Sequence, residues 1–331
     1  MTGALTWSRL SFRQQRWELL LIVLGMAIVA AIMLWFPIQL AETIAANPTC
    51  LPPDMELGPA AGCQAAVEDY YSIQSFADQF LLLSFAAPFG MGVLLGAPLV
   101  AREIEGGTAQ LAWTLAGSRA GWLLRRIAFA AVVVAVLLGV LAVTSEILAT
   151  ALVPDRDLAH DFQWEGRRGW LIVARGMGAL GLGLLVGAMI GRVLPAILAS
   201  AIVIGLAFTG LGVLHEELLR GEAVIWDQYS GDLAPGSKYI ADGIRTPDGT
   251  VYTRDEADAL GLEGNYMDER GRQYASEADM LAGRTIGTDI AFIIPGSRYP
   301  EVTVREGAVA GAVGLAALGL ATLVVQRRRP A

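Results

Sequence analysis

The stretch ELLLIVLGMAIVAAIMLWFPIQL, residues Glu18–Leu40, is almost entirely apolar. A helix needs about 20 apolar residues to cross the hydrocarbon core of a bilayer. Further stretches of this kind follow at Asp78–Val100, Ile127–Val153, Trp170–Ile190, Leu194–Leu214 and Gly307–Val325. Because 54% of the residues are apolar and the mean hydropathy is +0.51, the sequence predicts an all-α membrane protein with six transmembrane helices.

The placement of arginine predicts the orientation of these helices, since short cytoplasmic loops are enriched in Lys and Arg. With a cytoplasmic N-terminus, the inner segments hold Arg9, Arg13, Arg16, Arg102, Arg119, Arg125, Arg126, Arg192 and Arg327–Arg329. The loop between the first two spans holds acidic residues and no basic ones. Both termini are therefore predicted to be cytoplasmic. The basic inner rim fits contact with the lipid bilayer, and a nucleic-acid partner is not expected.

Four parts follow from this topology. Residues 1–17 precede the first span, 18–214 hold the first five spans with an inner loop at 101–126, 215–306 form an extracytoplasmic domain, and 307–331 hold the sixth span and a basic tail. The domain carries 17 acidic against nine basic residues over His215–Arg305, so it belongs in water. GTVYTRDEADAL (Gly249–Leu260) and GRQYASEADML (Gly271–Leu281) each predict a turn, a short strand and a helix start, hence a small mixed α/β insertion, unless the likeness is coincidence.

Cys50 and Cys63 are the two cysteines, and both fall in the first outer loop. Close spacing, an even count and oxidising conditions outside the membrane predict a disulfide, with a pair of free thiols as the alternative. A zinc site would need further ligands nearby, so no metal site is expected here.

Glycines recur at a regular spacing inside two of the spans. Gly183, Gly187 and Gly191 fall four residues apart, and Gly307 and Gly311 repeat this spacing in the last span. Such spacing permits close helix packing, either within one subunit or across a dimer interface.

The acid Glu146 in the third span and the base Arg175 in the fourth are expected at similar depth. Charges at that depth usually pair or face a watery cavity. The two residues are therefore predicted either to form an intramembrane ion pair or to line a substrate pathway.

Catalytic motifs are missing from the sequence. Lys238 is its only lysine, and the context PGSKY is no Walker A loop, so hydrolysis of ATP by that fold is excluded. The only histidines are His160 and His215, which rules out multi-histidine metal sites. We therefore expect no enzyme and no cofactor in this chain.

The inner loop has a sequence of its own, REIEGGTAQLAWTLAGSRAGWLLRR, residues 102–126. Arg102–Glu105 extends a helix, Gly106 and Gly107 break it, and Thr108 can cap the next turn. Ala109–Leu115 is short, amphipathic and tryptophan-bearing, as expected of a helix at the membrane interface.

This loop resembles the cytoplasmic coupling segment of ABC-2 type permeases, the membrane subunits of ATP-binding-cassette exporters, in their actinobacterial form. SFRQQRWELL resembles the basic amphipathic N-terminal helix of that family, and IIPGSRYPEV the segment before its last span. Ala116-Gly117 stands where the family often has a proline. The resemblance assigns coupling to the ATPase to Arg102, Glu103, Glu105, Gly106, Gly107, Thr108, Trp113, Ser118 and Arg119.

The resemblance implies a permease subunit in the bacterial plasma membrane that pairs with a second copy or a similar permease. A separate ATPase subunit would bind ATP and Mg. Few polar anchors line the apolar spans, which suits export of a hydrophobic or amphipathic substrate. The alternative is a membrane-anchored binding or sensor protein that acts through residues 215–306.

Overall fold

The computed structural model describes residues 2–51, 62–108, 118–227, 236–262, 264 and 266–328, with side chains from Trp17 onward except that of residue 18. The chain divides into two compact units. Unit 1 comprises Met1–Pro154, Trp164–Thr209 and Val304–Ala331, and unit 2 comprises Asp155–Gln163 and Gly210–Thr303.

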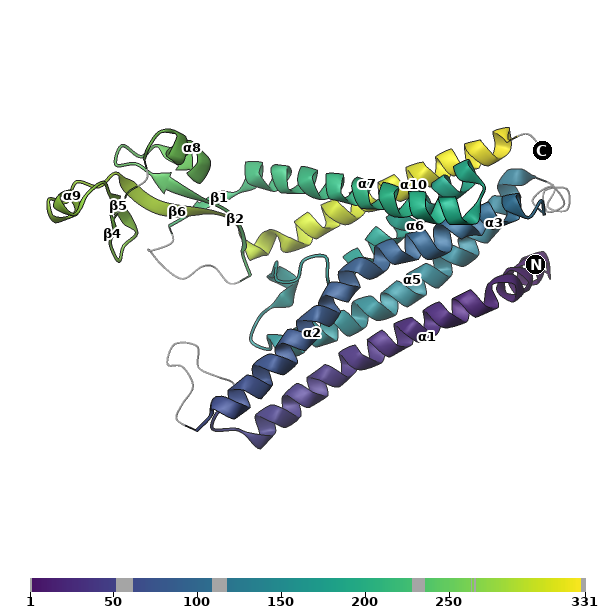
Figure 1. Cartoon of the computed structure of the whole chain (residues 1–331), viewed down its shortest axis with the longest axis horizontal. Coiled ribbons are helices and arrows are strands. Elements are labelled where there is room, and N and C mark those ends of the chain that lie inside the picture. Colours follow the sequence, from purple (N-terminus) through teal and green to yellow (C-terminus); the bar gives the residue numbers. More distant parts are fainter. Residues whose placement is uncertain are drawn as a thin grey trace. The chain divides into compact units, whose positions relative to one another are not determined.

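Long helices make up unit 1 (Figure 1). Six of the described helical segments are long and apolar enough to cross a membrane, as the sequence predicts. The helices are α1 (Thr2–Ala46), α2 (Gln64–Met91), α3 (Ala97–Glu105), α5 (Arg119–Leu152), α6 (Leu171–Ile190), and the unit 1 parts of α7 (Val193–Glu222) and α10 (Tyr299–Arg327). The π-helical turn η1 (Gly92–Gly96) joins α2 to α3, so Gln64–Glu105 is one span.

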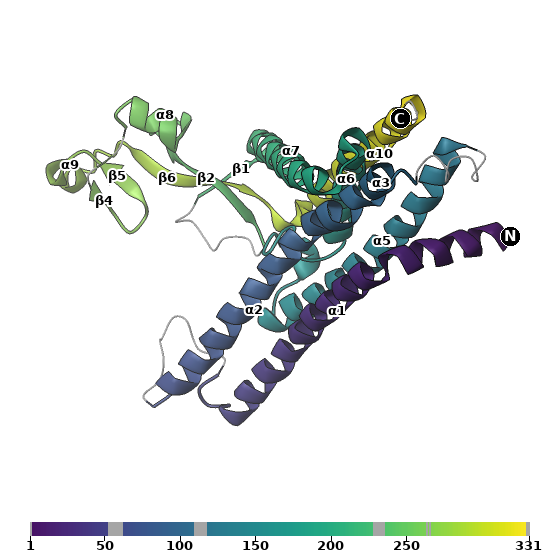
Figure 2. The ribbon, with the colours of Figure 1, turned by 45° about the vertical axis from the view of Figure 1, so that its right-hand side comes forward.

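Helices α1, α2 and α5 lie side by side (Figures 1 and 2). Their shared core includes Met33 of α1, Leu81 of α2 and Leu138 of α5, all fully buried. The predicted N-terminal helix, residues 1–17, is not separate, because α1 runs without a break from Thr2 into the first span. Burial of these apolar side chains holds the three helices together through close packing in lipid.

Helix α6 lies at the centre of unit 1 and touches its neighbours with its backbone. A Cβ on Gly183 would overlap the carbonyl oxygen of Gly92 in η1, and a Cβ on Gly187 would overlap that of Ala97 in α3. On another side of the helix, a Cβ on Gly178 would lie 2.7 Å from the Ala310 oxygen of α10. The predicted glycine spacing therefore serves packing within one chain at Gly183 and Gly187.

Gly191 has a different role, because it ends α6 in a left-handed conformation with φ of 68°. Its amide donates to the Gly187 oxygen at 3.0 Å, which closes the last turn of the helix. In α10, Gly307 lies against the ring of Trp170, whereas no described atom lies within 4 Å of a Cβ built on Gly311. The close helix contacts of α10 thus do not depend on both predicted glycines.

Unit 2 contains an antiparallel sheet with strand order β3-β2-β6-β5-β4, and β1 pairs with β6. The strands are β1 (Val224–Trp226), β2 (Lys238–Arg245), β3 (Val251–Thr253), β4 (Tyr266–Met267), β5 (Arg272–Tyr274) and β6 (Gly287–Ile294). Two short helices, α8 (Arg254–Ala259) and α9 (Glu277–Leu281), follow β3 and β5. The helices α7 and α10 extend past the predicted domain boundaries, because α7 ends at Glu222 and α10 begins at Tyr299.

Both copies of the sequence repeat fold as a turn, a strand and a helix start. An aspartate stabilises each turn. Hydrogen bonds from Thr246 and Thr250 lower the pKa of Asp248. Burial raises the pKa of Asp268, but hydrogen bonds from Arg272, Arg270 and Tyr274 outweigh it and lower this pKa to about 2.

The helix starts of the two copies are capped in the same way. Thr253 and Glu256 form the predicted capping box at α8, and the Ser276 hydroxyl accepts from the Asp279 amide at 3.1 Å at α9. The third residue of each helix is thus the acid that takes part in the cap, Glu256 in α8 and Asp279 in α9. The sequence match of the two copies does not align these two residues with each other. Local capping chemistry explains the repeat better than the letter match does.

The packing of α6 yields a first prediction. Replacing Gly187 with Ala forces its Cβ into the Ala97 backbone, and overpacking of this kind costs about 1–3 kcal/mol. Gly205→Ala in α7 is the matched control, because no described atom lies within 4 Å of its Cβ. Thermal unfolding in detergent should show a lower midpoint for Gly187→Ala than for the unchanged protein. Gly205→Ala should not lower the midpoint. Equal midpoints in the two variants would contradict the close packing.

Candidate functional site

A buried ion pair fixes the end of α3 to α5. The Arg126 Nη2 lies 2.6 Å from Glu103 Oε1, and both side chains are 9% exposed. The Thr108 hydroxyl donates to Glu103 Oε2 at 3.0 Å, and Arg126 Nη1 donates to the Leu99 oxygen at 3.1 Å. The guanidinium also lies 5.5 Å from the centre of the Trp122 ring. A buried carboxylate needs such partners, since an unpaired charge there would be strongly destabilising.

Glu105 joins the end of α3 to the start of α7. Its Oε2 accepts a hydrogen bond from the backbone amide of Val193 at 2.7 Å, and Val193 is the first residue of α7. The first amides of a helix lack partners within the helix and carry partial positive charge. Glu105 therefore caps α7 from a different helix.

Two arginines bind the carbonyl ends of helices in the same region. Arg119, the first residue of α5, donates from Nη1 to the Gln326 oxygen at 3.1 Å and to the Arg328 oxygen at 2.6 Å, at the end of α10. Arg328 in turn donates to the Ala188 oxygen of α6 at 2.6 Å. Cations are favourable at helix C-termini, where carbonyls are left without partners.

The residues at the two ends of the loop between α3 and α5 act as the sequence predicts. They end α3 and begin α5. Gly106 follows α3, and Gly107 has φ of 67°, a left-handed conformation that stops the helix. Ser118 caps α5, since its Oγ accepts from the Gly121 amide at 3.1 Å. Trp113 and the predicted interfacial helix Ala109–Leu115 lie outside the described residues.

Glu103 is buried in the structure, and its coupling to an ATPase stays a prediction. The resemblance places Arg102, Glu103 and Glu105 in polar contacts with an ATPase, but Glu103 is only 7% exposed and faces Arg126. Arg102 is half-buried, and Glu105, Thr108 and Ser118 are exposed. Glu103 thus holds α3 against α5, because α5 supplies Arg126, the last residue of the motif, as its partner. We define the inner network as Glu103, Glu105, Thr108, Arg119, Arg126 and Arg328.

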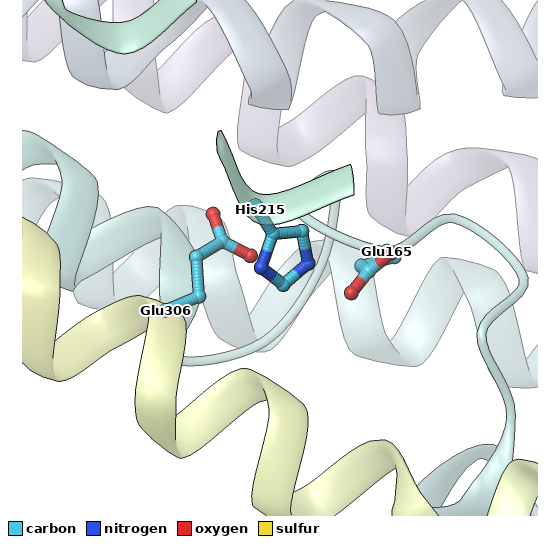
Figure 3. A group of neighbouring side chains, drawn as sticks. All are labelled: Glu165, His215 and Glu306. Carbon is cyan, nitrogen blue, oxygen red and sulfur yellow. The ribbon is translucent and has the colours of Figure 1, made fainter. Parts of the chain in front are cut away.

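The second group of predicted site residues lies farther along α5 and α6. Glu146 and Arg175 bind other residues, so the predicted pair between them is wrong, whereas a place along a substrate pathway stays a prediction. Glu146 Oε1 instead accepts from Arg168 at 2.8 Å, and Arg175 Nε donates to Glu306 Oε1 at 2.7 Å. The reason is that the loop before α6 supplies Arg168 and the helix α10 supplies Glu306, neither of which adjacent-helix reasoning could place. Figure 3 shows Glu306 on α10, together with Glu165 of that loop.

Cys50 and Cys63 form a disulfide with their Cα atoms 5.3 Å apart. It joins the segment after α1 to the residue that precedes α2. A bridge across a loop of this length stabilises a fold by about 3 kcal/mol, by restricting the unfolded chain. The two helices therefore emerge from a covalently fixed corner.

The helices and the inner network define a multi-pass membrane protein whose helix ends are joined by polar contacts. The family model described as ABC-2 membrane transporter related matches residues 23–217. The chain therefore belongs to the ABC-2 membrane transporter related family. The match agrees with the resemblance of the inner loop to ABC-2 type permeases. Comparisons with curated proteins and with solved structures find no match.

The buried pair supplies a second prediction. Glu103→Leu or Arg126→Met alone leaves one buried charge without its partner, which should lower the free energy of unfolding by about 3–5 kcal/mol. The double variant removes both charges and should lose less than the sum of the single variants. Chemical unfolding of all four proteins in detergent completes the double-mutant cycle. Additive losses would show that the two side chains do not interact.

Proposed function

We propose that this chain is the permease subunit of an ATP-driven exporter in the bacterial plasma membrane. The observation that carries the proposal is the family match over residues 23–217, which covers most of the spans and favours a permease over a membrane-anchored sensor. The sequence has one lysine and no Walker A loop, so a separate subunit must bind ATP and Mg. This division of labour is typical of the family.

The inner network supports a role in receiving force. The loop between α3 and α5 starts beside Glu105, which caps α7, and ends at Arg119, which binds the end of α10. Glu103 of α3 binds both Thr108 of this loop and Arg126 in the first turns of α5. A displacement of this loop by an ATPase would therefore move several helix ends together rather than bend a free connector.

The charges support an orientation in which the inner network faces the cytoplasm. Arg102, Arg119, Arg126, Arg192 and Arg328 all lie at or near helix ends on this side of unit 1. The positive-inside rule places such a cluster in the cytoplasm. The disulfide between Cys50 and Cys63 then lies outside, where oxidising conditions maintain it.

The exposed face of α7 supports pairing with a second permease subunit. Helix α7 exposes large apolar side chains in its unit 1 part, including Leu194, Leu198, Ile202 and Leu206. Such a surface requires lipid or another apolar helix as its neighbour. Pairing with a second copy or with a similar permease, as the family resemblance implies, would cover part of it.

The third prediction tests the ATPase partner. The tagged chain, purified from native membranes in mild detergent, should carry with it a subunit that has a Walker A motif and hydrolyses ATP. Trp113→Ala should reduce this co-purification, because the resemblance places Trp113 in the docking segment. Trp35→Ala is the matched control, since Trp35 is an exposed tryptophan of α1.

The readout is the amount of ATPase subunit recovered per permease, measured by mass spectrometry together with ATP hydrolysis in the eluate. Absence of any ATP-binding subunit would contradict the proposal. Equal recovery of the ATPase subunit with Trp113→Ala and Trp35→Ala would instead show that Trp113 is not part of the docking surface. Glu103 is not a suitable docking variant, because its substitution disrupts the buried pair with Arg126.

A further inference from the structure

The loop Trp164–Trp170 contacts four helices of unit 1, and we call it the latch loop. The Trp164 indole donates to Asp78 of α2, and Arg168 donates to Glu146 of α5 at 2.8 Å. The Gly166 oxygen accepts from Arg175 of α6 at 3.1 Å. At the end of the loop, the Trp170 ring lies against Gly307 of α10, where a Cβ would overlap it. Seven residues thus bridge α2, α5, α6 and α10.

The backbone of the latch loop adopts conformations that depend on these contacts. Gly166 and Gly169 have φ of 74° and 68°, which glycine adopts without strain. Trp164 has φ of 56°, the one described residue other than glycine with positive φ. A bulky residue in this region is strained, and it persists only where surrounding contacts hold it. The hydrogen bond from Trp164 to Asp78 is such a contact.

The charges of the latch loop and of the helices around it also hold the loop in place. Arg168 is 3% exposed in its side chain, whereas its partner Glu146 is 41% exposed. Loss of the carboxylate would remove this ion pair from a buried guanidinium, which weakens the attachment of the loop to α5. Arg175 holds a second pair, with Glu306, and the same guanidinium binds the Gly166 oxygen. Release of the loop therefore requires the breaking of a few specific bonds.

We propose that the latch loop is a gate that closes this end of the helix bundle and opens during the transport cycle. Glu146 and Arg168 form its principal lock, and Trp164 and Arg175 hold the loop in register. The closed state follows from the contacts of this chain alone. Opening during transport rests on the proposed function, because an ATPase must supply the energy.

The test uses a cysteine as a reporter of opening. Ser145 of α5 is fully buried beside Glu146, and Ser145→Cys changes the side chain little. Cys50 and Cys63 are joined in a disulfide, so the new thiol is the reactive one. The protein is labelled with fluorescein maleimide, which does not cross membranes, in vesicles whose sidedness exposes the Cys50–Cys63 corner.

Glu146→Gln and Arg168→Gln should each raise the labelling rate of the reporter about tenfold or more, because either one breaks the lock and increases local opening. The double variant should label no faster than the singles. The matched control is Arg125→Gln, an exposed arginine near the start of α5, and it should leave the rate unchanged. If Arg168→Gln fails to fold, Glu146→Gln decides alone, since Glu146 is the more exposed partner. Unchanged labelling in the lock variants would overturn the proposal.

A second arm separates a gate from a static plug. In the chain co-purified with its ATPase, ATP should increase labelling of the reporter when Glu146 and Arg168 are intact, and should add little in the lock variants. If ATP does not change the labelling rate in an active complex, the gate proposal is overturned and the permease assignment stands. Failure to recover any ATPase would overturn the proposed function, whereas the first arm would still report on the latch.

Discussion

The structure of unit 1 depends on the close approach of α6 to the helices around it. Gly183 and Gly187 bring the α6 backbone against the backbone of η1 and α3, and Gly178 brings it against α10. Side chains larger than hydrogen would separate these helices, and in lipid no hydrophobic effect drives them together again. The π-helical turn Gly92–Gly96 is part of the same contact, because it presents the Gly92 oxygen to Gly183. Tight backbone packing thus fixes η1, α3 and α10 to α6.

At both ends of this packed core, polar contacts join helix to helix. In the inner network the Glu105 carboxylate binds a helix start, and the Arg119 and Arg328 guanidiniums bind helix ends, in keeping with the charges of the helix termini. Toward the latch loop, Arg168 and Arg175 bind carboxylates from α5 and α10. Both groups reach α5, α6 and α10, so a rigid helix could transmit movement from one group to the other. The proposed ATP-driven cycle requires such a physical link.

Much of the helical architecture could be predicted from the sequence, because long apolar stretches have few alternatives to spanning a bilayer. Gly183 and Gly187 were identified by spacing, and the capping box of Thr253 and Glu256 by residue type. The charge partners could not be predicted. Glu146 binds Arg168 of a loop, and Arg175 binds Glu306 across 131 positions of sequence, so no helical periodicity relates them. The burial of Glu103 was missed for the same reason, since its partner Arg126 belongs to the next helix.

The most direct test of the account is hydrogen–deuterium exchange of the full complex with and without bound ATP. We predict that ATP binding to the partner subunit changes exchange in the inner network, at the end of α3 and the start of α7, and also in the latch loop. Both changes should occur at the same ATP concentration, because the packed helices connect the two ends. Changes confined to the ATPase subunit, with the exchange of this chain unaltered, would contradict the account.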